Sequence, residues 1–278
     1  MNLQILNTEL LLDEMKTDGH APLKFICDSG DIYFCKYLKS ISRSELNCLA
    51  YEVVASFLLR SLEVPTPEIA LVKISPSTLI KEKIKYNRRL QTGNICFGSK
   101  EIKFSTELQA LQHNIKKKDF TAIANPEDLI KIAIFDLWVL NMDRGKNNKD
   151  GEINYNLLLQ PEDKKQRIIA FDHSFIFGGV QQIGTFNPQM GVSAHNTLIQ
   201  TPYYKNTIKH IEKGRFISIV EEFVSLLRNF DQAALVKLIE SLHSYWTLSF
   251  KLEDRIINLL TNKNHIKTCK DIIINSKR

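Results

Sequence analysis

The first third of the chain alternates short apolar runs with turn-forming residues. Two apolar, aromatic-rich runs, Leu23–Cys27 and Ile32–Leu38, flank the four residues Asp28–Asp31. Because Asp-Ser-Gly-Asp is rich in turn formers, this pattern predicts a β-hairpin. A third apolar run, Ile69–Ile74, predicts another strand further along the chain.

A helix is predicted between the hairpin and the third strand. Apolar residues recur there at helical spacing up to about Leu62, and Ser42 or Ser44 could cap the start. Pro65 and Pro67 follow directly. Proline cannot continue a helix and also restricts the residue before it, so the helix is expected to end before them.

A second helix is predicted after Asn125–Asp128, where an asparagine cap, a proline and two acidic residues suit a helix start. Its body, Leu129–Leu140, is apolar nearly all round, which is typical of a helix buried in a core. The polar loop Asn141–Tyr155 follows. Short strands are then predicted at Asn156–Leu159 and Arg167–Phe171 on either side of a turn.

The remainder of the chain is predicted to be helical. Helical periodicity begins at about Ile208 and is clearest in Phe216–Leu227 and Ala233–Trp246. Strands therefore dominate the start and helices the end. A lone parallel sheet would alternate strands and helices throughout, so this order predicts an α+β fold.

Composition and charge exclude some classes of function. The 278 residues are 44% hydrophobic and 24% charged, as in ordinary globular proteins, and no apolar run is long enough to cross a bilayer. The formal charge is +6, with clusters at Lys81–Arg89 and Lys116–Lys118. These clusters lack interleaved aromatic residues beyond Tyr86, and no nucleic-acid-binding motif accompanies them. We therefore expect a solvated basic surface, with neither a membrane nor a nucleic acid as partner.

The cysteines point to a reducing compartment. There are five, an odd number, and no two of them form a CxxC pair. This pattern favours neither a disulfide framework nor a zinc site. We accordingly expect a cytoplasmic protein.

Two aspartates stand out by position. Asp143 lies in the polar loop that follows the buried helix, and Asp172 interrupts an apolar strand. A carboxylate inside an apolar run is costly unless it is paired or bound to a metal. Phosphoryl transfer needs one carboxylate near the nucleophile and oxygen ligands for Mg²⁺. Asp143 suits the first role, as base or orienter of the acceptor hydroxyl, and Asp172 suits the second, as the main magnesium ligand.

The segments WVLNMDR, NLLL and IAFDHSFIFG, in this order, resemble the catalytic and metal-binding segments of HipA-like kinases. They resemble those of phosphatidylinositol kinases more distantly. Asp172, His173 and Ser174 stand where a protein kinase has Asp-Phe-Gly, and His173 is expected to be a structural, hydrogen-bonded residue. The resemblance covers roughly residues 18–180.

An asparagine is expected to complete the metal site. Asn148 follows Asp143 by five residues, which is the spacing of the catalytic Asp and Asn in the kinase signature. It would act in the catalytic loop and supply a neutral oxygen to the metal. The insertion Lys149–Asn154 interrupts the family pattern, so Asn154 and Asn156 remain alternative ligands.

The resemblance also implies a nucleotide-binding set in the first part of the chain. Lys36 ends a strand, as the ATP-phosphate lysine does in kinases, and Glu52 lies on the next helix, where a kinase keeps the glutamate that pairs with it. Lys39 and Glu45 are the competing choices. Gly19, before the first strand, is the candidate for a phosphate-covering turn.

Taken together, the resemblance implies a two-lobed protein-kinase-like fold. A small β-rich lobe would cover residues 1–80, a mainly helical lobe residues 81–278, and ATP would bind in the cleft between them. The implied activity is ATP- and Mg-dependent transfer to a serine or threonine of a protein substrate, with a possible partner or antitoxin protein. The alternatives are a lipid or small-molecule kinase and a non-catalytic nucleotide-binding or scaffold module.

Overall fold

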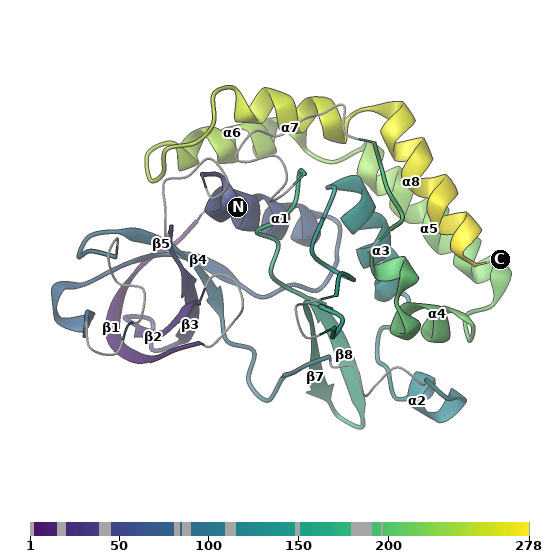
Figure 1. The fold of residues 1–278 in the computed structure, drawn as a ribbon, viewed down its shortest axis with the longest axis horizontal. Helices are drawn as coiled ribbons and strands as arrows, with labels where there is room; N and C mark the ends of the chain where they lie inside the picture. The colour runs from purple at the N-terminus through teal and green to yellow at the C-terminus, as the bar shows by residue number, and fades with distance from the viewer. Residues whose placement is uncertain are drawn as a thin grey trace.

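Figure 1 shows the computed structural model of the chain, in which a strand barrel is followed by a mainly helical region. The structure describes residues 3–15, 21–38, 46–80, 84, 90–108, 115–147, 151–178, 191–195 and 197–277. Several residues named above lie outside these ranges: Gly19, Lys39, Ser42, Ser44, Tyr86, Asn148, Lys149 and the basic cluster Lys81–Arg89 apart from Ile84. The competing choice Glu45 lies outside them as well. Predictions that concern these residues remain predictions.

Five strands close into a barrel in the order β1-β2-β3-β5-β4. They are β1 (Ile5–Glu14), β2 (Leu23–Cys27), β3 (Ile32–Lys36), β4 (Ile69–Lys73) and β5 (Ile95–Lys100). Neighbouring strands are antiparallel except β1 and β4, which are parallel. The predicted hairpin of β2 and β3 and the strand β4 are present. The final strand, β5, pairs with β3 and β4 although it lies beyond residue 80.

Side chains alternate along the barrel strands between the interior and the outside. On β2, Leu23, Phe25 and Cys27 are buried while the residues between them are half-exposed. The interior also takes in Cys35 and Cys96. Burial raises the pKa of the Cys27 and Cys96 thiols to about 12, so both stay protonated and behave as small apolar groups. All five cysteines are free.

Helix α1 (Cys48–Ser61) lies between the barrel and the C-terminal helices, as Figure 1 shows. Nearly every residue of α1 is buried, because both neighbours pack against it. It ends before Pro65 as predicted, and Glu63 takes a positive φ of 56° to reverse the chain. Helix α1 therefore has a fixed position relative to both parts of the molecule.

The second part of the chain surrounds the buried helix α3 (Asp128–Trp138). A three-stranded sheet in the order β6-β7-β8 lies on one side of it, and α5 and α8 pack on the other. The remaining elements are β6 (Thr106–Glu107), α2 (Lys117–Thr121), β7 (Leu157–Glu162), β8 (Lys165–Ala170), α4 (Pro202–Ile208), α5 (Lys213–Arg228), α6 (Gln232–Leu242), α7 (Leu252–Leu260) and α8 (Lys263–Ser276). Two sheets, both mainly antiparallel, with five consecutive helices at the end of the chain agree with the predicted α+β class.

The segment that joins α6 and α7 contacts the barrel side of the molecule. Helix α6 ends at Leu242, four residues before the predicted end, and Trp246 instead donates its indole N–H to the Ile95 carbonyl at 2.9 Å. Asn47, at the start of α1, donates to Ser249 Oγ at 2.9 Å and accepts from the Ser249 amide at 3.0 Å. These bonds fix the start of α1 from the C-terminal side. Across the described ranges, no helix is both long and apolar enough to span a membrane.

The buried His265 makes the stability of the fold dependent on pH. Its Nε2 donates to the Trp138 carbonyl at 2.7 Å, and Cys269 Sγ lies 4.0 Å away. Burial lowers the pKa of His265, so the folded state resists a proton that the unfolded chain accepts. The resulting stability is present above the unfolded pKa of about 6.5 and is lost as the pH falls below it.

We predict that His265→Gln, which keeps a neutral donor, reduces this loss. From pH 7 to pH 5 the free energy of unfolding should fall less steeply in the variant than in the wild type. The two slopes should differ by up to about 1.4 kcal/mol per pH unit, the value for one proton. Urea denaturation at several pH values measures this slope. His195→Gln, at an exposed position, should keep the wild-type slope. Equal slopes for His265→Gln and the wild type would contradict the prediction.

Candidate active site

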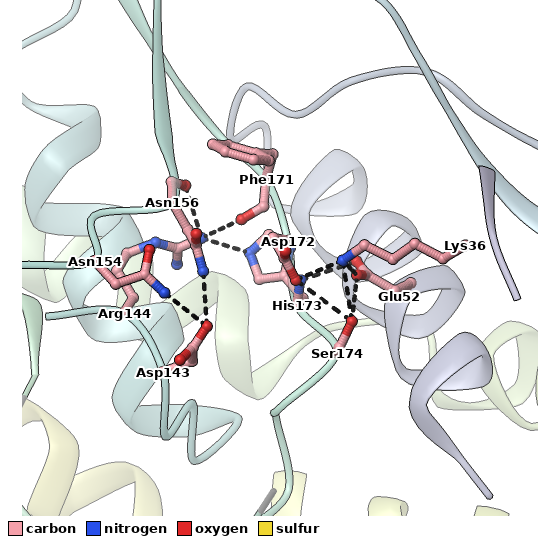
Figure 2. A network of polar contacts seen from close by, with 10 residues as sticks. All are labelled: Lys36, Glu52, Asp143, Arg144, Asn154, Asn156, Phe171, Asp172, His173 and Ser174. Carbon is pink, nitrogen blue, oxygen red and sulfur yellow. Dashed lines mark hydrogen bonds and ion pairs between the residues drawn. The ribbon is translucent and has the colours of Figure 1, made fainter. Parts of the chain in front are cut away.

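Three segments far apart in the sequence meet at the ammonium group of Lys36 (Figure 2). Its Nζ lies 2.6 Å from Glu52 Oε1 and 2.6 Å from Asp172 Oδ1. Ser174 Oγ lies 3.1 Å from the same nitrogen and donates to Glu52 Oε1 at 2.7 Å. The structure thus brings the predicted residues Lys36, Glu52 and Asp172 together, and it adds Ser174.

The local structure explains why these side chains converge. Lys36 is the last residue of β3, and Glu52 lies one turn into α1 with 2% of its surface exposed. Asp172 follows β8 and has a positive φ of 55°, which turns its side chain out of the strand pattern. A non-glycine residue in this conformation costs about 1 to 3 kcal/mol and persists only where its surroundings hold it. Here Lys36 supplies that hold.

The charges of this cluster determine one another's protonation. Burial alone would raise the pKa of Asp172, but the charge and hydrogen bond of Lys36 outweigh burial and lower it to about 2. Burial also opposes the charge of Lys36, yet Asp172 and Glu52 together raise its pKa above the ordinary value. The cluster therefore holds an ammonium against a carboxylate at neutral pH. The Asp172 side chain remains 31% exposed, so the pair is open to a ligand on one side.

Asp143 is held by two amide groups. Asn154 Nδ2 donates to Asp143 Oδ2 at 2.8 Å, and Asn156 Nδ2 donates to the same oxygen at 3.0 Å (Figure 2). Burial and the nearby Asp172 raise the pKa of Asp143, while the Asn156 hydrogen bond opposes the rise. Asn156, a predicted metal ligand, thus lies between the loop and the strand β7 that follows it.

Arg144 connects the loop to the ends of two strands. It is fully buried and forms an ion pair with Asp136 of α3. Its Nε donates to the Tyr155 carbonyl at 3.0 Å, before β7, and its Nη2 donates to the Phe171 carbonyl at 2.8 Å, after β8. One guanidinium group therefore sets the positions of the segments that carry Asp143, Asn156 and Asp172.

His173 accepts from this arginine. Its Nε2 lies 3.0 Å from Arg144 Nη2, and its backbone N–H donates to Glu52 Oε2 at 2.9 Å. Burial and the charge of Arg144 lower the pKa of His173 well below its usual range, so the ring is neutral and can accept. The predicted structural role of His173 agrees with these contacts. Sequence reasoning missed Arg144 and Asp136, although a charged Asp136 within the apolar run IAIFDLW of the predicted buried helix was the available signal.

The ligands that a magnesium ion prefers are present here. Asp172 offers a part-exposed carboxylate, and the Asn156 amide group lies beside Asp143 with its nitrogen committed to that carboxylate. Carboxylate and amide oxygens suit Mg²⁺ better than the softer transition metals. Within the described part of the chain, no group of three or more His, Cys, Asp or Glu residues could hold a metal ion. The Asp172 carboxylate and the Asn156 amide oxygen fit a metal ion that takes its remaining ligands from bound phosphate oxygens and water.

The buried ion pair yields a prediction for Arg144. We expect Arg144→Met to lower the free energy of unfolding by about 3 to 5 kcal/mol, because it leaves the buried Asp136 carboxyl without its counter-ion and with only the Asn141 amide as a partner. Adding Asp136→Leu should recover part of that loss. The matched control is Arg167→Met, which removes an exposed pair with Glu162 and should change little. Urea denaturation that shows equal losses for Arg144→Met and Arg167→Met would contradict the role assigned to Arg144.

A glycine in the same loop yields a second prediction. Gly145 has a φ of +92°, and a Cβ atom there would lie 2.5 Å from the Thr197 oxygen and 2.6 Å from the Leu198 nitrogen. Gly145→Ala should therefore cost more than about 2 kcal/mol of unfolding free energy. Gly151→Ala is the control: its φ is +80°, but no described atom lies within 4 Å of the added Cβ. It should cost only about 1 kcal/mol. Equal losses in urea denaturation would refute the close approach.

The fold of this chain is similar to that of a solved kinase structure. The crystal structure of the Helicobacter pylori proinflammatory kinase CtkA is similar over 98% of this chain and 98% of that chain, with a TM-score of 0.54 and 11% sequence identity. The Golgi casein kinase with Mn/ADP bound matches over 95% of this chain and 74% of its own, with a TM-score of 0.48 and 14% identity.

The HipA protein of Shewanella oneidensis MR-1, in complex with HipB and its operator DNA, matches over 96% of this chain and 62% of its own, with a TM-score of 0.36 and 9% identity. No curated protein sequence matches the chain at a significant level. A family model described as HipA-like kinase matches residues 15–216, well over half of the 278 residues. The chain belongs to the HipA-like kinase family.

Proposed function

We propose that this protein is an ATP- and Mg-dependent phosphotransferase that acts on a serine or threonine hydroxyl of a protein. The observation that carries the proposal is the Lys36 cluster, in which one ammonium is shared by Glu52 and the part-exposed Asp172. Such an arrangement suits a nucleotide phosphate, which can take the place of one carboxylate beside Lys36. Asp172 then becomes available to a metal ion on the same phosphates.

The residues divide the work as follows. Lys36 would hold the phosphates, and Glu52 would keep Lys36 in place from α1. Asp172 and the amide oxygen of Asn156 would hold Mg²⁺, which neutralises phosphate charge when bound. The nitrogen of the Asn156 amide is bonded to Asp143, so its oxygen remains the group for a metal. Asn148, chosen for its spacing, remains an alternative.

Asp143 would orient the acceptor hydroxyl. Its carboxylate is held in place by amide groups and belongs to the loop that Arg144 ties to β7 and β8. Positioning and charge neutralisation, rather than a covalent intermediate, would supply the rate. The proposal of a serine or threonine acceptor is supported by membership of the HipA-like kinase family. The proposal that a partner or antitoxin protein binds this chain has the same support. We also propose a two-lobed arrangement with ATP between the barrel and the helical part.

Phosphoryl transfer measures this function directly. The purified chain is incubated with Mg-ATP labelled on the γ-phosphate, with casein added as acceptor, and labelled protein and released phosphate are both counted. We expect transfer to casein or to the chain itself, and at least about a hundredfold loss in Asp143→Asn.

Asp163→Asn is the matched control, because Asp163 is exposed in the β7–β8 turn. It should retain the wild-type rate. Two outcomes would refute the proposal: neither labelled protein nor released phosphate from the wild type, or equal rates for Asp143→Asn and the wild type.

A further inference from the structure

Asp143 receives both of its side-chain hydrogen bonds on a single oxygen. Asn154 and Asn156 donate to Oδ2 at 2.8 and 3.0 Å, and among the described residues none donates to Oδ1. A carboxylate turns readily about its last side-chain bond, because that torsion has broad minima. Two donors on one oxygen remove this freedom. They also leave a defined second oxygen for another partner.

Asn154 reaches this position through the insertion that separates the loop from β7. Its carbonyl accepts from the Gly145 amide at 2.7 Å, and its own amide donates to the Lys146 carbonyl at 2.8 Å. Asn147 and Ile153 form an isolated antiparallel bridge beyond these bonds. The inserted segment therefore returns onto the loop that carries Asp143, and its last residue presents its side chain to the carboxylate.

Asn156 is fixed independently of the insertion. Its φ of 46° places it in the left-handed region, and its carbonyl accepts from the Phe171 amide at 3.1 Å. The two amide groups thus approach Asp143 from separately anchored pieces of backbone. Hydrogen bonds to a carboxylate are stronger than neutral ones, so each contributes to holding its orientation.

We propose that Asn154 is a positioning residue that, together with Asn156, locks Asp143 Oδ2 and leaves Oδ1 to receive the acceptor hydroxyl. This inference rests on the proposed phosphotransferase function. It gives the insertion a role in the reaction, because Asn154 is the last residue of that insertion.

The contact itself is tested by exchanging donor and acceptor. Asn154→Asp places two carboxylates against each other and should lower the Tm. Adding Asp143→Asn restores the hydrogen bond, because the new amide at position 143 donates to the new carboxylate at position 154. Asn156 can then accept from the amide at position 143 by turning its own amide group. The Tm of the double variant should therefore lie close to that of the wild type, and well above that of Asn154→Asp alone. Thermal unfolding without nucleotide measures this and needs no activity.

The matched control uses the exposed Asn147 of the same loop. Asn147→Asp adds the same charge, and its effect on the Tm should be independent of Asp143→Asn. The Tm changes of Asn147→Asp and Asp143→Asn should therefore add up in the double variant. If the Tm changes of Asn154→Asp and Asp143→Asn add up in the same way, Asn154 does not hold Asp143 and the proposal is overturned.

The positioning role is tested by kinetics. Asn154→Ala should lower kcat by about 100-fold while the KM for Mg-ATP stays within about twofold, since only the acceptor side is misplaced. Asn147→Ala should leave both unchanged. A wild-type kcat in Asn154→Ala would overturn the positioning role. If the wild type transfers no phosphate at all, the proposed function fails, and the catalytic role of Asn154 fails with it, while the Tm exchange still decides whether the contact exists.

Discussion

The ion pairs of the largely buried Lys36 ammonium are the interactions on which the arrangement of the molecule depends. A charge taken out of water is costly unless its partners are in place, and the partners here come from α1 and from the segment after β8. The barrel, α1 and the β7–β8 pair must therefore keep one relative position. Two further hydrogen bonds join these parts: Asn47 at the start of α1 bonds to Ser249 in the α6–α7 segment, and Trp246 of that segment bonds to Ile95 of β5.

A second cation, the buried Arg144, also joins separate segments through its charge and hydrogen bonds. Arg144 pairs with Asp136 and donates to carbonyls at the ends of β7 and β8, so the loop of Asp143 cannot move independently of Asp172. Lys36 faces the part-exposed side where a ligand could bind, whereas Arg144 is entirely enclosed. One charge thus serves the candidate chemistry, and the other sets its geometry.

Local periodicity was enough to predict β2, β3, α1 and α3, because each has its own turn or proline boundary. Lys36 and Glu52 were selected by the resemblance to HipA-like kinases, which assigns one residue to a strand end and the other to the next helix. Closure of the barrel was not predicted, because the pairing of β1 with β4 joins residues far apart in sequence. The contacts of Arg144 and Asn154 were not predicted either, because a sequence pattern does not show which carbonyl or carboxylate a side chain in an irregular loop will meet.

Binding of ATP with and without Mg²⁺, measured by isothermal titration calorimetry on the wild type and on Asp172→Asn, tests most directly whether the Lys36 cluster is a metal-nucleotide site. We expect the wild type to bind ATP about tenfold more tightly, or better, when Mg²⁺ is present, and Asp172→Asn to lose that difference. Asp163→Asn should behave as the wild type. An ATP affinity that is independent of Mg²⁺ in the wild type, or equally dependent on it in Asp172→Asn, would contradict the role of this cluster.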